Sequence, residues 1–131
     1  MKSETLLEVA AKIAGQAYAP YSEYKVGAAL LCADGTVFTG CNVENSSYGL
    51  TICAERTAIF SAIKEGRRDL VALAVVTLGE HMPYPCGACR QVLSEFCPGE
   101  FSVYVATVGA LEDYEVISLG ELLPHGFKLI D

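Results

Sequence analysis

Apolar residues recur along the chain with two different spacings, and each spacing predicts one kind of element. Over residues 4–18 they fall at the spacing of a helical face, and Ser3 is placed to cap that helix. Pro20 cannot continue a helix, so we expect the helix to end before it. The apolar face of this helix consists of Leu6, Val9, Ala10, Ile13, Ala14 and Ala17.

Short apolar runs bounded by turn residues predict the strands. Residues 25–32 and 36–41 flank Asp34-Gly35, which is a strong signal for a tight hairpin turn. Residues 70–78 form an almost continuous apolar run, as expected of a central strand that is covered on both faces. Two further strands are expected at residues 101–108 and 114–117.

Helices are expected between these strands, and the order of the elements predicts the fold. They are expected at residues 53–65, at residues 86–96, and after Ser118, which forms a capping box with Glu121. This order predicts an α/β fold of three layers, α/β/α, with a five-stranded mixed sheet in the middle. No repeat, low-complexity segment or linker divides the sequence, so we expect residues 1–131 to form a single domain.

Composition and charge narrow the class of protein and of partner. Hydrophobic residues make up 52% of the chain and charged residues 19%, which is typical of a globular protein. The net charge is −7 with nine Lys and Arg, so a nucleic acid polymer is not expected as a ligand, because it is bound through basic side chains. No apolar run reaches the ~18 residues of a membrane span, and residues 1–5 do not resemble a signal peptide. We therefore expect a cytoplasmic protein without a membrane partner.

Three cysteines and one glutamate carry the strongest chemical signal. A Cys-x-x-Cys pair such as Cys86 and Cys89 is by itself typical of both metal sites and dithiol redox sites. Cys53, followed two residues later by Glu55, makes the pattern more specific, because three thiolates can hold zinc and leave its fourth position to water. Zinc lowers the pKa of that water to about 7, and Glu55 is placed to carry its protons. The remaining cysteines, expected to be small buried hydrophobes, are Cys32, Cys41 and Cys97.

The metal ligands are expected at the starts of two helices. Cys86 and Cys89 share one helical face, whereas Cys53 and Glu55 can approach one site only from a first turn. We therefore expect zinc between two helix N-termini, whose partial positive charge favours thiolates. Arg56 follows three residues after Cys53 and is expected to donate a hydrogen bond to its sulfur.

The motifs together resemble one family. Cys53-Ala54-Glu55-Arg56 and Pro85-Cys86-Gly87-Ala88-Cys89-Arg90-Gln91 closely resemble the small zinc-dependent cytidine deaminases. Shorter motifs that resemble the same family are Tyr18-Ala19-Pro20-Tyr21-Ser22, Gly40-Cys41-Asn42-Val43-Glu44-Asn45, and Glu121-Leu122-Leu123-Pro124 with Phe127. The resemblance spans nearly the whole chain. It implies hydrolytic deamination of free cytidine and 2'-deoxycytidine in pyrimidine salvage, with one Zn²⁺ per subunit on the three cysteines and Glu55 as the proton carrier.

The resemblance also implies a substrate pocket and an assembly. Asn42 and Glu44 resemble the family's ribose-binding pair, and Tyr24 and Phe127 resemble the aromatic pair that brackets the base. Tyr24 departs from the usual Phe, so its hydroxyl needs a hydrogen-bond partner. The family is homotetrameric with active sites shared between subunits, which implies that Phe127 comes from a neighbouring subunit. The loop residues expected to complete the pocket are Asn45, Ser46 and Tyr48.

Other functions fit parts of the pattern. Deaminases of cytosine-containing antibiotics such as blasticidin S share the metal motifs, although Arg56 and the motif Asn42-Val43-Glu44-Asn45 favour an ordinary nucleoside. A structural zinc module that binds a partner would need a fourth protein ligand, and none is evident in the sequence. A dithiol redox site at the Cys-x-x-Cys pair would leave Cys53 and Glu55 unexplained.

Overall fold

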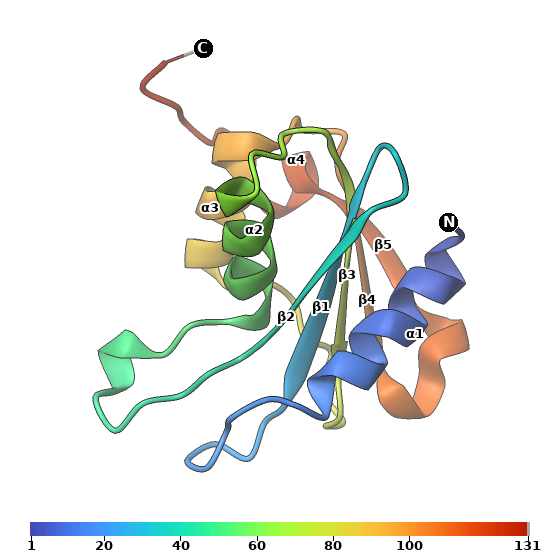
Figure 1. The fold of residues 1–131 in the computed structure, drawn as a ribbon, viewed down its shortest axis with the longest axis vertical. Coiled ribbons are helices and arrows are strands. Elements are labelled where there is room, and N and C mark those ends of the chain that lie inside the picture. Colours follow the sequence, from blue (N-terminus) through green and yellow to red (C-terminus); the bar gives the residue numbers. More distant parts are fainter. Residues whose placement is uncertain (131) are drawn as a thin grey trace.

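The fold is built on one mixed sheet between two helical layers, and the computed structural model describes residues 1–130 of it (Figure 1). The five strands lie in the order β2-β1-β3-β4-β5. β3 and β4 pair in parallel, and the other neighbours pair antiparallel. This confirms the predicted five-stranded mixed sheet. The strands are β1 (Val26–Cys32), β2 (Val37–Cys41), β3 (Leu70–Thr77), β4 (Ser102–Thr107) and β5 (Glu115–Ser118).

Helices cover both faces of the sheet, as predicted for three layers. α1 (Ser3–Ala14) packs on one face, and α2 (Ala54–Lys64), α3 (Gly87–Phe96) and the short α4 (Leu119–Leu122) pack on the other (Figure 1). Two 3₁₀ helices lie in connections, η1 (Tyr48–Leu50) and η2 (Val108–Asp113). The helices within residues 1–130 are all too short or too polar to span a bilayer.

The central strand β3 contributes to the apolar core on both faces of the sheet. Leu73 and Val75 are fully buried on the side of α2 and α3, and Ala74 and Val76 are fully buried on the side of α1. Each fully buried side chain of the size of Leu or Val contributes about 1.5–3 kcal/mol relative to exposure. The continuous apolar run predicted this two-sided burial correctly.

The first helix differs from its prediction in two ways. Lys2, and not Ser3, occupies the N-cap position of α1, and no side chain caps it; the Ser3 hydroxyl lies 3.1 Å from the Tyr114 hydroxyl instead. The helix also ends at Ala14 and does not reach residue 18. Beyond it, the Tyr18 amide donates to the Asn42 carbonyl at 3.0 Å, so tertiary pairing replaces the last helical turn. The capping box of α4, by contrast, is confirmed.

Gly40 on β2 lets α2 lie directly against the sheet. An added Cβ there would lie 2.5 Å from the Ala58 amide nitrogen and 2.6 Å from the Ala54 carbonyl oxygen. Because real Cβ atoms essentially never approach backbone atoms so closely, only glycine permits this contact. The contact fixes the height of the first turn of α2 above the sheet, and that turn carries several residues of the site described below.

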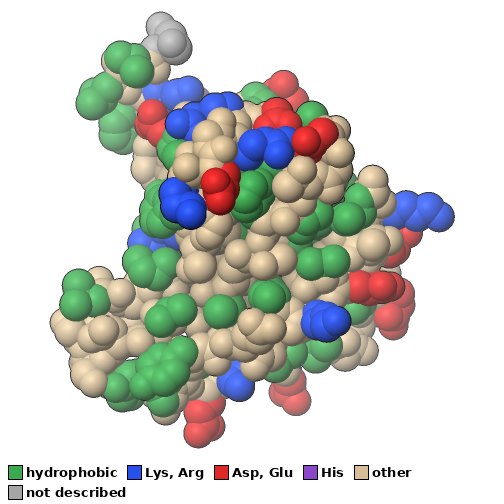
Figure 2. All heavy atoms as spheres, in the orientation of Figure 1, with side chains coloured by type: hydrophobic (Ala, Val, Ile, Leu, Met, Phe, Trp, Pro, Cys, Tyr) green, Lys and Arg blue, Asp and Glu red, His purple; other side chains and the backbone are tan. Residues whose placement is uncertain are grey.

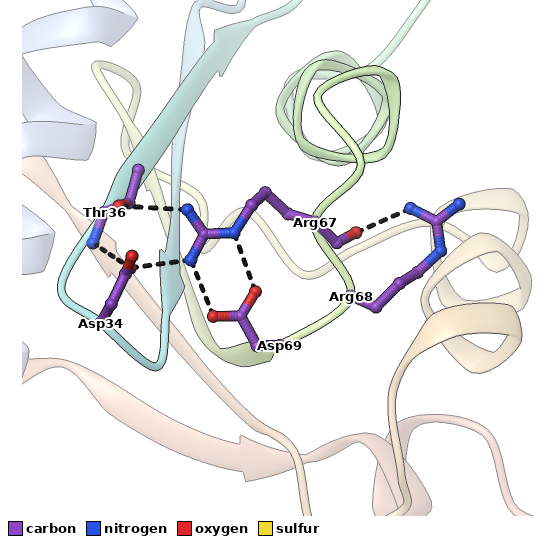
Figure 3. Close-up of polar contacts among 5 residues, drawn as sticks. All are labelled: Asp34, Thr36, Arg67, Arg68 and Asp69. Atoms are coloured by element: carbon purple, nitrogen blue, oxygen red, sulfur yellow. Dashed lines mark hydrogen bonds and ion pairs between the residues drawn. The ribbon is translucent and has the colours of Figure 1, made fainter.

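Arg67 fastens the β1–β2 turn to the segment that leads into β3 (Figure 3). One of its terminal nitrogens lies 2.7 Å from a carboxylate oxygen of Asp34 and 2.7 Å from one of Asp69, and the other donates to the Thr36 hydroxyl at 3.2 Å. The guanidinium holds the pKa of both carboxyl groups below the ordinary range. The cluster thus joins two connections that are far apart in sequence.

Candidate active site

Three cysteine sulfurs meet where α2 and α3 begin. Cys53 occupies the N-cap position of α2, Cys86 occupies the N-cap position of α3, and Cys89 follows in the first turn of α3. The Cys86 sulfur lies 3.8 Å from that of Cys53 and 3.5 Å from that of Cys89, and all three sulfurs lie within 4.8 Å of one another. The cluster that was predicted between two helix N-termini therefore forms.

The spacing of the sulfurs fits a zinc ion. Sulfurs bound about 2.3 Å from a tetrahedral zinc are separated from one another by about 3.8 Å. Of the His, Cys, Asp and Glu side chains in residues 1–130, only these three cysteines form a metal-holding group. A set of three protein ligands is typical of catalytic zinc, whereas structural zinc normally takes four.

Arg56 places a positive charge beside the sulfurs. Its Nη2 donates to the Cys53 sulfur at 3.4 Å, and its buried Nε has no hydrogen-bond partner within residues 1–130. Hydrogen bonds from Cys89 and from Arg56 lower the pKa of Cys53 to about 5. The pKa of Cys89 is raised, because its thiol serves as the donor to Cys53 and because it is buried. Cys53 therefore supplies a thiolate near neutral pH, which is the form that ligates a metal.

Glu55 lies in the first turn of α2 and shares a cavity wall with two of the cysteines. The residue is 4% exposed and lines the same cavity as Cys53 and Cys86. Burial raises the pKa of its carboxyl to about 7, and the charge of Cys53 acts in the same direction. Glu55 does not belong to the metal-holding group, so its carboxyl is available to accept and release protons.

The cavity beside the cluster has a volume of about 240 Å³. Its wall is largely apolar, with the polar side chains of Asn42 and Glu55 directed to it, which is typical of a small-molecule site. Several of its lining residues were not predicted from the sequence, namely Val26, Thr51, Met82, Pro83 and Tyr84. Three of these belong to the loop that precedes Cys86, and proximity to a metal ligand was the one signal that could have found them.

Asn42 and Glu44 hold the chain around residues 21–26 as well as facing cavities. Asn42 accepts a hydrogen bond from the Val26 amide at 2.9 Å, donates one to a backbone carbonyl at 2.8 Å, and lines the cavity with Glu55. Glu44 lines an adjoining cavity and accepts from the amides of Tyr21 and Ser22 at 3.0 and 3.1 Å. The Ser22 hydroxyl also donates to Glu44 and is the main cause of its lowered carboxyl pKa. Their assignment to ribose stays a prediction.

The remaining predicted pocket residues are distributed over two regions. Tyr48 lines the adjoining cavity, and the Ser46 hydroxyl bonds to that of Tyr21 at 2.6 Å. Asn45 accepts from a backbone amide two residues on, so its side chain shapes its own turn. Phe127 is 65% exposed and lines neither of these two cavities of its own chain. Tyr24 lines the first cavity, and its hydroxyl has a partner, described below.

The sequence and the fold both match known proteins. A sequence model described as the cytidine and deoxycytidylate deaminase zinc-binding region matches residues 1–105. A cytidine deaminase from Halalkalibacterium halodurans is 50% identical over 131 residues, covering 100% of this chain and 98% of the relative. A crystal structure of cytidine deaminase from Burkholderia pseudomallei has a TM-score of 0.91 at 49% identity, covering 97% of this chain and 100% of that one. The structure of the Mycobacterium tuberculosis cytidine deaminase has a TM-score of 0.84 at 42% identity, covering 98% and 99%. The chain therefore belongs to the zinc-binding cytidine and deoxycytidylate deaminase family.

Proposed function

We propose that this chain catalyses the zinc-dependent hydrolytic deamination of cytidine and 2'-deoxycytidine to uridine and 2'-deoxyuridine, with release of ammonia. One observation carries the proposal: three sulfurs lie at the separations of a tetrahedral zinc site, and two of these cysteines, Cys53 and Cys86, share a small cavity with the buried carboxyl of Glu55. Relatives named cytidine deaminase are about half identical over the full length of the chain. The net charge of −7 favours a free nucleoside over a nucleic acid polymer.

The roles of the residues follow from their positions. Cys53, Cys86 and Cys89 would hold the zinc, which when bound supplies Lewis-acid activation of water near neutral pH. Glu55 accepts a proton from the attacking water and delivers it to N3 of the base. The same carboxylate then takes the remaining proton from the new C4 hydroxyl and passes it to the 4-amino nitrogen, which leaves as ammonia. A C4–O bond forms and the C4–N bond breaks, so cytidine and water become uridine and ammonia.

Residues around the cavity orient the substrate in this proposal. The Tyr24 ring stacks on the base, and Asn42 and Glu44 bind ribose hydroxyls from the two adjoining cavities, which share Thr51. Arg56 moderates the negative charge of the thiolates, so the zinc stays a useful Lewis acid.

Substitution of Glu55 by Gln tests the proton carrier, because the side chain keeps its shape and loses its basic group. We expect kcat/KM for cytidine to fall roughly 10²–10⁴-fold, the usual contribution of general acid–base catalysis. The reaction is followed by the ultraviolet absorbance of cytidine and by ammonia release. Zinc content is measured in parallel, and Glu95→Gln on the exposed side of α3 is the matched control.

Two results would contradict the proposal. A Glu55→Gln variant within threefold of wild type would remove Glu55 as the proton carrier. A zinc-loaded wild type that releases no ammonia from either nucleoside would favour a structural zinc module. A panel with a cytosine-containing antibiotic and an oligodeoxycytidine tests the substrate class, and faster turnover of either would replace the free nucleoside.

We further propose that the active form is a cytoplasmic homotetramer in which Phe127 closes the cavity of a neighbouring subunit. Six free cysteines suit a reducing compartment. Hydrophobic side chains are exposed on the loop that contains η1 and on the C-terminal tail (Figure 2). Tyr48 is 76% exposed and Leu129 is 93% exposed, which is costly unless another surface covers them.

Mass and complementation test the shared site. Light scattering should give four times the subunit mass of 14.0 kDa. Phe127→Ala alone and Glu55→Gln alone should each lose activity, whereas their co-expression should restore part of it. Recovery is expected because a mixed assembly contains sites with an intact Glu55 from one subunit and an intact Phe127 from another. An active monomer, or mixtures that stay as inactive as their parents, would show that each site is self-contained.

A further inference from the structure

Residues 78–86, the loop between β3 and α3, form one wall of the cavity. Met82, Pro83 and Tyr84 line it, and the ring of Tyr24 lines it as well. The Tyr24 hydroxyl donates to the backbone carbonyl of His81 at 2.9 Å, so a residue before β1 is joined to the middle of a loop that follows β3. The Tyr24 hydroxyl, which was expected to need a hydrogen-bond partner, therefore has one in the loop that forms the cavity wall.

We propose that the Tyr24 hydroxyl is a positioning group for substrate binding. It holds the His81 carbonyl and thereby keeps the wall formed by Met82 and Pro83 ordered before the substrate arrives. The inference rests on the proposed deaminase function, because that function makes this cavity the nucleoside site. A loop that is ordered in advance does not lose conformational entropy when the ligand binds, so the hydroxyl favours affinity.

The two ends of the loop are fixed independently of Tyr24. At the start, the Leu78 amide donates to the Lys25 carbonyl at 3.0 Å, and the Gly79 amide donates to the Thr77 hydroxyl at 3.0 Å. At the end, Nε of Arg90 donates to the Pro85 carbonyl at 2.7 Å. The residue before Cys86 thus keeps its place without the tyrosine hydroxyl.

The middle of the loop has few other attachments. Within residues 1–130, the other hydrogen bonds of residues 80–84 are the Tyr84 amide to the Met82 carbonyl at 3.0 Å and the Tyr84 hydroxyl to Glu115 at 2.5 Å. The first bond lies inside the loop and does not attach it to the rest of the chain. The Tyr24 hydroxyl is therefore one of two side-chain attachments of this segment.

The ring of Tyr24 also packs on the start of the loop, which separates the role of the ring from that of the hydroxyl. An added Cβ at Gly79 would lie 3.2 and 3.3 Å from two ring carbons of Tyr24. A phenylalanine would keep this packing and any stacking on the base. Tyr24→Phe therefore removes only the bond to His81.

The test compares wild type, Tyr24→Phe and the control Tyr104→Phe. Tyr104 lies on β4 and packs against Tyr114, and its hydroxyl forms no hydrogen bond within residues 1–130. Tyr104→Phe therefore removes one hydroxyl oxygen, as Tyr24→Phe does, without breaking a hydrogen bond. For Tyr24→Phe we expect KM for cytidine to rise roughly three- to tenfold, the effect of one ordinary hydrogen bond. We expect kcat within about twofold of wild type and unchanged zinc content, because Arg90 holds Pro85. Amide hydrogen exchange should become faster in the peptide covering residues 78–86.

Each alternative result overturns the inference. An unchanged KM with unchanged hydrogen exchange would show that the hydroxyl neither orders the loop nor supports substrate binding. A higher KM without faster exchange would mean that the hydroxyl contacts the substrate directly. A lower melting temperature with an unchanged KM would leave it a purely structural role. If wild type deaminates no cytosine nucleoside, the proposed function fails, and the exchange of the loop still decides whether the hydroxyl orders it.

Discussion

A methyl group added at Gly40 would show how strictly the sheet positions the helix that carries Glu55. The added Cβ of Gly40→Ala would lie 2.5 Å from the Ala58 nitrogen, 2.6 Å from the Ala54 oxygen and 2.9 Å from Thr57 Cβ, whereas ordinary contacts are 3.4–4 Å. These atoms belong to the helix backbone or sit directly on it, so no side-chain rotation can relieve the clash. The start of α2 must therefore move away from β2 by about 1 Å, the difference between these contacts.

The expected losses follow from that displacement. Overpacking of this kind costs about 1–3 kcal/mol of stability. Cys53, Glu55 and Arg56 all lie at the N-cap or in the first turn of α2, so the displacement moves them relative to α3. A misplacement of about 1 Å can reduce the rate about 100-fold. With a typical domain stability of about 5–15 kcal/mol, most molecules remain folded, so the lost activity reports geometry and not unfolding.

Urea denaturation and steady-state kinetics of the zinc-loaded protein measure the two effects separately. We expect Gly40→Ala to lose about 1–3 kcal/mol and about 100-fold in kcat/KM for cytidine. Gly109→Ala is the matched control, because a Cβ at Gly109 in η2 meets no atom within 4 Å. A folded Gly40→Ala protein with kcat/KM within threefold of wild type would refute the reasoning, since the contact would then not govern the catalytic geometry.

Three further predictions concern charge and metal. Arg56→Gln should release zinc to a competing chelator about 10–100-fold more readily. The control Arg68→Gln, which loses bonds to backbone carbonyls and a cation–π contact with the Phe96 ring, should not; equal release by both would remove the proposed role of Arg56. Arg67→Ala should lower the urea midpoint at pH 7. The difference between variant and wild type should shrink below about pH 4. Asp34 and Asp69 have lowered pKa values in the folded protein, so their ionised carboxylates stabilise the fold above the unfolded pKa, and this stabilisation is lost as acid protonates them. A difference that stays constant down to pH 3 would contradict this linkage. Removing the metal with dipicolinate should abolish deamination, and one Zn²⁺ per subunit should restore it. If metal analysis shows that the protein is free of zinc and it is still fully active, the zinc mechanism is excluded.

The order of the elements was predictable because local pattern and tertiary structure agree over most of the chain. Gly35 has a φ of +92° and Gly66 a φ of +80°, a backbone conformation that favours glycine. Gly35 therefore marks the turn between β1 and β2, and Gly66 marks the end of α2. The end of α1 was not predictable in the same way. Residues up to Tyr18 suit a helix locally, but the pairing of the Tyr18 amide with the Asn42 carbonyl depends on chain that lies more than twenty residues away.

The metal site was predictable for a chemical reason, and most of the cavity wall was not. Thiolates and a nearby carboxylate at this spacing have few other uses, so residue types alone indicated them. Met82, Pro83 and Thr51 are ordinary residues in loops, and their role comes only from where the chain places them. Arg90 belongs to the motif Pro85-Cys86-Gly87-Ala88-Cys89-Arg90-Gln91, but only the structure shows its bond to the Pro85 carbonyl, which holds the segment before Cys86.

Asn42 and Glu44 show why sequence alone could not separate loop polarity from ligand binding. A carboxylate offers about four acceptor sites, and the Tyr21 amide, the Ser22 amide and the Ser22 hydroxyl occupy three of those of Glu44. Asn42 likewise uses one amide hydrogen and one lone pair on the backbone, which leaves one of each. In the proposed ribose site, each side chain would therefore bind a ribose hydroxyl through the donor or acceptor positions that its hydrogen bonds to the protein leave unused. Those bonds fix its orientation beforehand, so binding orders no additional side chain, and the two roles reinforce each other.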